Sequence, residues 1–165
     1  MNKSLHKLLP VLFGFFVMGF CDVVGISTSY VQQDFGLSET LAGFIPSMVF
    51  IWFLLLSIPA ALVMNRIGRK ATALAGYAFT VVGLTAPYAA GTGCAPVWYF
   101  VGFGLLGIGN TAIQVAVNPL LATSVPESRM TSYLTVGQIF RNTSLLLLAP
   151  VVTALTAWTG SWRLL

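Results

Sequence analysis

The chain has 165 residues, of which 57% are hydrophobic and only 7% are charged. A soluble domain carries roughly 25% charged residues, so this composition excludes a water-soluble globular protein. The net charge of +4 comes from basic residues spread over the chain, which argues against nucleic-acid binding. The apolar runs reach the roughly 20 residues of a spanning helix and lack the alternation of barrel strands. We therefore predict an all-α integral membrane protein, a polytopic helical bundle.

Five apolar stretches are predicted to span the membrane as helices. In chain order they cover residues 8–30, 41–64, 71–90, 97–122 and 133–157. Their short connections favour antiparallel neighbours in one bundle. Residues 162–165 would begin a sixth span, so residues 1–165 are expected to form an incomplete six-helix domain. Ahead of the second stretch, Ser38 and Glu39 form part of a helix-start signal.

The basic side chains predict a multi-pass protein of the cell (inner) membrane with a cytoplasmic N-terminus. In this orientation, six of the eight basic residues lie on the inside: Lys3, Lys7, Arg66, Arg69, Lys70 and Arg129. Such an excess satisfies the positive-inside rule. The first apolar stretch exceeds the 7–15 residues of a signal-peptide core, so we expect it to be retained as a signal anchor.

Polar residues inside the spans recur at helical spacing and form three rows. The rows are Asp22, Gly25, Ser29 and Gln33 in the first span, Gly107, Asn110, Gln114 and Asn118 in the fourth, and Thr135, Gln138, Arg141 and Asn142 in the fifth. Because such rows would be costly against lipid, we expect them to face one another or a water-filled cavity. The amides would also suit simple packing between helices, whereas the charged Asp22 and Arg141 favour a functional cavity.

Six of these residues are candidate substrate ligands: Asn110, Gln114, Asn118, Gln138, Arg141 and Asn142. Their amides suit the hydroxyl groups of a sugar, whereas an anionic substrate would make Arg141 the main ligand. At the helical rise, Gln114 and Arg141 lie level, about 12 Å from the inner helix ends, and Asp22 lies about 21 Å from its own. We therefore expect Arg141 to extend part of the way toward Asp22. Asp22 is the candidate proton carrier, because within the spans only its side chain changes protonation near neutral pH.

No metal ion, cofactor or enzymatic activity is predicted. Cys21 and Cys94 have no metal-ligand spacing, and His6 lies ahead of the first span. The spans contain one Asp, no Glu and no His, so they offer neither paired carboxylates nor metal ligands.

Residues 61–70, Ala-Leu-Val-Met-Asn-Arg-Ile-Gly-Arg-Lys, resemble the loop signature of the major facilitator superfamily. That signature, Gly-x-Leu-x-Asp-Arg-x-Gly-Arg-Lys, lies between spans two and three. The resemblance implies a conformational loop formed by Asn65, Arg66, Gly68, Arg69 and Lys70. In the family, the acidic residue helps to lock neighbouring helices in one state of the transport cycle. Asn65 stands at its position and lacks the charge, and a basic turn alone would also satisfy the positive-inside rule.

Three further stretches resemble the fucose permease branch of this superfamily, whose members are proton-coupled sugar symporters. They are residues 32–38, Asn118-Pro119 followed by residues 126–128, and Gln138 with Phe140. In that branch a carboxylate stands four residues before the asparagine, where this chain has Gln114. A first-span carboxylate is also displaced, since Gly25 lies near the expected place and Asp22 one turn earlier.

The resemblance implies twelve spans and alternating access around a small-molecule substrate, a sugar in this branch, with proton coupling. Membrane lipid and a missing C-terminal transporter half are the implied partners. We expect this chain to be a truncated frame or fragment that does not transport alone. Two alternatives remain: efflux of drugs or metabolites by a carrier of the same superfamily, and a non-transporting membrane accessory protein.

Overall fold

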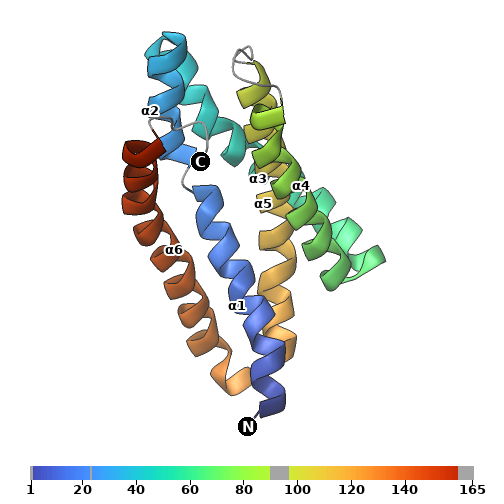
Figure 1. The fold of residues 1–165 in the computed structure, drawn as a ribbon. Helices are drawn as coiled ribbons and strands as arrows, with labels where there is room; N and C mark the ends of the chain where they lie inside the picture. Colours follow the sequence, from blue (N-terminus) through green and yellow to red (C-terminus); the bar gives the residue numbers. More distant parts are fainter. Residues whose placement is uncertain (1, 23, 90–96, 160–165) are drawn as a thin grey trace.

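The computed structural model of the protein describes residues 2–22, 24–89 and 97–159. These residues form a bundle of helices without a strand (Figure 1). The elements are α1 (Asn2–Asp22), α2 (Val24–Phe35), α3 (Glu39–Ile67), α4 (Arg69–Ala89), α5 (Val97–Ser124), the short 3₁₀ helix η1 (Glu127–Arg129) and α6 (Met130–Thr159). The predicted all-α fold is confirmed over this part of the chain.

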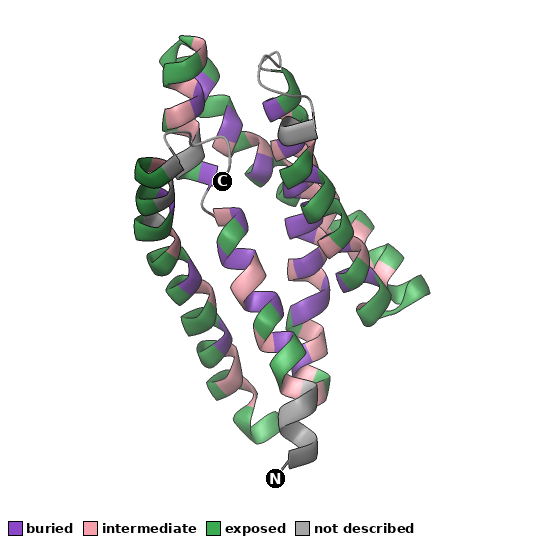
Figure 2. Ribbon diagram, in the orientation of Figure 1, coloured by how far each residue is buried: buried purple, intermediate pink, exposed green. Residues whose placement is uncertain are grey.

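Among the described residues, three helical segments are long and apolar enough to cross a membrane: Glu39–Ile67, Val97–Ser124 and Glu127–Trp158. A shorter apolar helix covers Leu8–Asp22. Large apolar side chains of α3 point outward, and Leu54 is 75% exposed. Figure 2 shows the same exposure along the outer side of α6. Such surfaces are stable in lipid, where exposed apolar groups carry no cost.

The predicted spans can be compared with the observed helices. The first, residues 8–30, is covered by α1 up to Asp22 and by α2 from Val24, and residue 23 lies outside the described residues. The second, fourth and fifth predicted spans lie within α3, α5 and α6, and α4 covers the third up to residue 89. Residue 90 and residues 162–165, where a sixth span was expected, lie outside the described residues.

Both ends of α3 have a local chemical cause. Ser38 is the N-cap residue, and its Oγ accepts a hydrogen bond from the Leu41 N–H at 3.4 Å, which confirms the helix-start signal. At the other end, the Gly68 N–H donates to the Met64 carbonyl at 2.8 Å. Gly68 has a φ of 88°, a conformation that glycine adopts without steric cost. The glycine of the loop signature therefore ends α3 and lets α4 begin.

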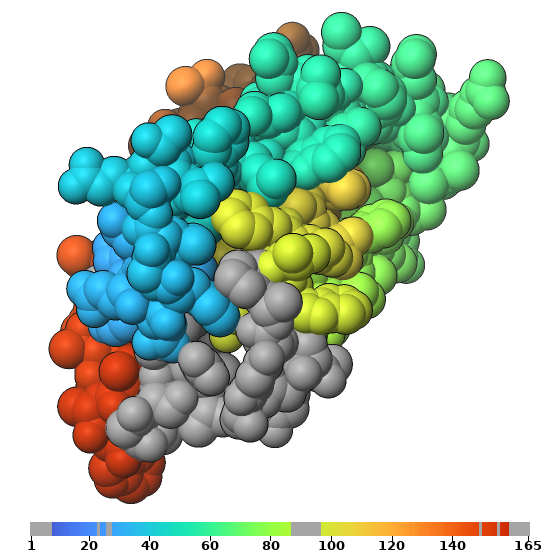
Figure 3. All heavy atoms as spheres, turned by 90° about the horizontal axis from the view of Figure 1, so that it is seen from above, coloured from blue at the N-terminus to red at the C-terminus, as the bar shows by residue number. Residues whose placement is uncertain are grey.

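Helix α5 lies at the centre of the bundle. It has eleven buried residues, whereas α3 has three. Its contact with α4 is close because glycines face each other: a Cβ atom at Gly76 would lie 2.9 Å from the Gly109 carbonyl oxygen, and one at Gly83 would lie 2.7 Å from that of Gly102. Small residues at such crossings are typical of membrane helices. Seen end-on, α5 is visible between α3 and α4, and α6 forms the corner farthest from α4 (Figure 3).

In the part of the chain that the structure describes, the core has two apolar clusters, one above the other. The first contains Cys21, Val24, Val31, Ile45, Val49, Tyr99 and Leu106; the second contains Val11, Phe15, Met18, Ile113, Val117 and Leu121. Along α1 the boundary between them falls after Met18, and along α5 it falls between Leu106 and Ile113. The polar residues Asp22 and Asn110 therefore lie near the level at which the clusters meet.

Candidate functional site

A bidentate ion pair joins α1 to α6. Arg141 Nε donates to Asp22 Oδ2 at 2.6 Å, and Arg141 Nη2 donates to Asp22 Oδ1 at 2.9 Å. Both side chains are largely buried, with 22% of Arg141 and 23% of Asp22 exposed. The planar guanidinium matches both carboxylate oxygens, which lysine cannot do. Each charge thus has a partner within the bundle.

The contact between α1 and α6 explains why this pair forms. The two helices run in the same direction (Figure 1), with Phe15 against Gly137 and Gly19 against Ser144. A Cβ atom at Gly137 would lie 2.8 Å from Phe15 Cε2. We predicted that Arg141 reaches only part of the way to Asp22, and the structure corrects this, because contact at the glycines brings the two side chains together. The sequence signals that we missed are Gly19 and Gly137.

A small cavity of about 100 Å³ adjoins Asp22. It is lined by Cys21, Asp22, Val24 and Gly25 at the junction of α1 and α2, and by Pro46, Val49 and Phe50 of α3. A Cβ atom at Gly25 would have no neighbour within 4 Å, so space is open beside the carboxylate. The volume is below the roughly 300–1,000 Å³ of sites for drug-sized ligands.

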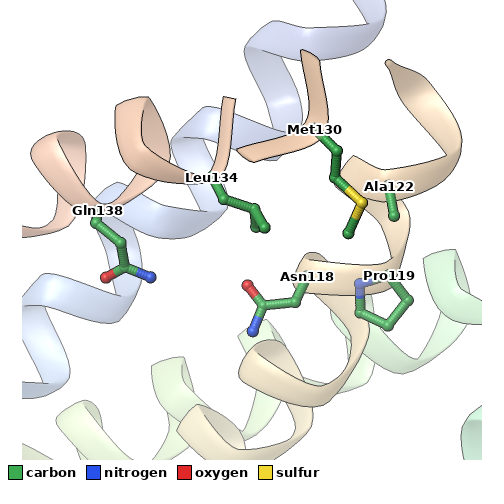
Figure 4. A pocket seen from close by; sticks show the side chains of 6 residues that line it. All are labelled: Asn118, Pro119, Ala122, Met130, Leu134 and Gln138. Atoms are coloured by element: carbon green, nitrogen blue, oxygen red, sulfur yellow. The ribbon is translucent and has the colours of Figure 1, made fainter. Parts of the chain in front are cut away.

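A larger open pocket of about 610 Å³ lies between α5 and α6. Its lining combines the amides of Asn118 and Gln138 with four apolar residues: Pro119, Ala122, Met130 and Leu134. Figure 4 shows the two amide side chains on facing helices, with Leu134 between them. This volume falls within the range of small-molecule sites, and the amides offer both donors and acceptors.

The six candidate ligands do not share one cavity. Arg141 joins Asp22, and Asn118 joins Gln138, whereas the side chain of Asn142 is exposed and lines neither cavity. Asn110 is 4% exposed, and its Oδ1 has no hydrogen-bond partner among the described residues. Gln114, one turn further along α5, is partly buried. The Asn110 oxygen is therefore an acceptor held inside the bundle without a donor.

The predicted conformational loop contacts α5 through one of its residues. Arg69 Nη1 donates to the Pro119 carbonyl at 3.2 Å and to Thr123 Oγ1 at 3.0 Å. Both acceptors lie near the C-terminal end of α5, where the helix dipole favours a positive charge. Arg69 therefore ties the start of α4 to the end of α5. Asn65, Arg66 and Lys70 are exposed.

These helices, with a charge pair and amides between them, define a multi-pass helical membrane protein. Residues 11–165 match the family model of the Major Facilitator Superfamily, so the chain belongs to this superfamily. The match confirms the resemblance predicted from the loop between α3 and α4.

One curated relative is the L-fucose-proton symporter of Escherichia coli (strain K12). It is 26% identical to this chain over 111 residues, which cover 67% of this chain and 25% of the relative. The aligned part therefore spans about a quarter of the relative's length. No solved structure gives a significant match to the chain.

Proposed function

We propose that this chain is the N-terminal part of a secondary transporter that moves a small solute by alternating access. The Asp22–Arg141 pair carries the proposal, because charges inside a membrane bundle are costly and mark substrate or ion pathways. Membership of the superfamily supports it. In such carriers the substrate lies near the bilayer midplane between two halves, so a C-terminal half is the partner we propose, with membrane lipid around both.

We propose a neutral sugar as the substrate. Asp22 already occupies two donor groups of Arg141, so an anionic substrate would have to displace that carboxylate. The amides of Asn118 and Gln138 in the larger pocket are suited to hydroxyl groups. The relative's name, L-fucose-proton symporter, agrees with this choice. The amides of Asn110, Gln114 and Asn142 remain candidate ligands that the second half would complete.

A second candidate is efflux of an apolar drug or metabolite. Four of the six residues that line the larger pocket are apolar, which suits a ligand with few hydroxyl groups. Binding of a sugar panel and an apolar drug panel would separate the candidates, with Asn118→Ala and Gln138→Ala as variants. Weaker binding of one sugar in both variants supports the sugar carrier. Drug binding unaffected by either variant favours efflux. Gln33→Ala, which removes an exposed amide of α2 away from both cavities, is the matched control.

We propose that the proton, if it drives transport, is carried by Asp22. Loss of the Arg141 contact would leave this carboxylate beside a small cavity whose α3 wall is apolar. The test joins the chain to the C-terminal half in proteoliposomes. Asp22→Asn should abolish accumulation driven by a pH gradient but preserve exchange of substrate between equal compartments. Accumulation against a gradient by Asp22→Asn would assign Asp22 a structural role.

We further propose that the protein lies in the inner membrane of the cell. In the proposed orientation, its N-terminus and the loop between α3 and α4 face the cytoplasm.

A further inference from the structure

Gly19 lies at the closest approach of α1 to α6. A Cβ atom at this position would overlap Ser144 Oγ and the carbonyl oxygen of Arg141. Gly19 precedes Asp22 by three residues, so this contact lies one helical turn from the ion pair. The carbonyl that it touches belongs to Arg141 itself. The separation of the backbones at Gly19 is thus linked directly to the position of the guanidinium.

The α6 side of this contact is fixed. Ser144 is fully buried, and its hydroxyl donates to the Arg141 carbonyl at 2.7 Å. The hydroxyl is therefore held against Gly19 rather than free to rotate away. One helical turn before Gly19 in α1, the Phe15 ring packs against Gly137 of α6. Glycines on both helices thus set the distance between α1 and α6.

A small increase in the distance between α1 and α6 would break the two hydrogen bonds of the ion pair. A methyl group at Gly19 would require the helices to separate by roughly 1.5 Å to reach ordinary van der Waals contact with the Ser144 hydroxyl. Such a shift would take the two hydrogen bonds from 2.6 and 2.9 Å to beyond the roughly 3.2 Å limit of a good N–H···O bond. The small cavity beside Asp22 offers no replacement cation among the described residues, since the others that line it are Cys21 and apolar residues.

We infer that Gly19 is a positioning residue for the Asp22–Arg141 pair, and that the pair forms only while α1 lies directly against α6. A small separation of these helices then releases both charges together. Within the proposed transporter, on which this last step rests, that separation frees Asp22 to exchange a proton. The contact at Gly19 is therefore the mechanical link between helix packing and the charged site.

The test observes the Arg141 Nε–H by nitrogen-15 NMR of the arginine-labelled chain in lipid nanodiscs. The chain has five arginines, and the signal lost in Arg141→Lys assigns the one required. In the unaltered chain we expect a hydrogen-bonded signal that moves to a free-guanidinium position in Asp22→Leu, because leucine has no acceptor. Gly19→Ala should move it to the same position. Ser144→Ala, which removes the hydroxyl without adding bulk, should leave it unchanged.

Lengthening the carboxylate side chain distinguishes a loss of positioning from general damage to the fold. Asp22→Glu adds one methylene, about the length lost when the helices separate, so the double variant Gly19→Ala/Asp22→Glu should recover the bonded signal. Gly14→Ala is the matched control on the same helix, because its Cβ would lie 2.7 Å from Tyr77 Oη and 3.0 Å from Val117 Cγ2, away from α6. It should disturb packing without moving the Arg141 signal.

Retention of the bonded signal in Gly19→Ala overturns the inference, as does a failure of Asp22→Glu to restore it. If Gly19→Ala does not fold, Ser144→Val adds bulk to the same contact from α6. Loss of the bonded signal in a folded Ser144→Val supports the inference, and its retention contradicts it. These NMR measurements do not depend on transport activity. A correct NMR pattern without solute movement by the assembled carrier would therefore refute the proposed function and leave the inference standing.

Discussion

Removing both charges of the Asp22–Arg141 pair should cost far less stability than the two single removals added together. A lone Asp or Arg at the centre of a spanning helix costs about 2.5–3.5 kcal/mol. Asp22→Leu leaves the guanidinium without its two hydrogen bonds, and Arg141→Met leaves the carboxylate without them. Because about a fifth of each side chain is exposed, we expect about 3 kcal/mol for each single variant, the low end for a buried pair.

The double variant Asp22→Leu/Arg141→Met replaces the pair by apolar groups and should cost only about 2–3 kcal/mol, far less than the sum of the single variants. The coupling energy would then be about 3 kcal/mol, at the upper end for residues in contact. The assay is reversible unfolding of the purified chain in mixed micelles, followed by circular dichroism. Glu127→Leu and Arg66→Met alter exposed charges and serve as the control cycle, with coupling near zero. Additive single variants at the ion pair would refute the reasoning.

Three further predictions follow from the packing and the sequence. Gly109→Ala places a Cβ atom 2.5 Å from Thr80 Oγ1 and 2.7 Å from the Gly76 carbonyl, so it should destabilise the chain by about 1–3 kcal/mol in the same assay, whereas Gly43→Ala, with no neighbour within 4 Å, should not. Arg69→Ala removes two hydrogen bonds to the end of α5 and should speed amide hydrogen exchange around Thr123, and unchanged exchange would show that the contact does not hold this end. An impermeant maleimide applied to intact cells should label Cys94 and spare the buried Cys21, and labelling of Cys94 only after permeabilisation would reverse the proposed topology.

The helices were predictable from the sequence because their cause is local. A run of about 20 apolar residues specifies a spanning helix without reference to its neighbours. Ser38 and Gly68 mark the ends of α3 through hydrogen bonds within a few residues.

The arrangement of the site was less predictable because it depends on how helices lie against each other. Counting residues from the helix ends placed Arg141 level with Gln114 and short of Asp22. That count ignores the offset between α1 and α6, which is set by a contact of Gly19 with the backbone of α6. The same limit applies to the amides: helical spacing placed Asn118 and Gln138 on rows of polar residues, but only the packing of α5 near α6 puts them in one pocket.

Asp22 is the one carboxylate among the described residues of the five predicted spans, and its position limits any coupling mechanism. The sugar symporter pattern expects a carboxylate at position 114, where this chain has an amide that cannot release a proton. In the proposed transporter, proton exchange within these spans would therefore pass through Asp22. Asp22 holds Arg141 through two hydrogen bonds, and Arg141 is attached to α6 rather than to the helix that carries Gln114. A proton taken up by Asp22 would weaken the contact between α1 and α6, so protonation and helix separation would favour each other. In the proposed transporter, a carboxylate paired across this particular contact would thus convert a change of one charge into a change of packing.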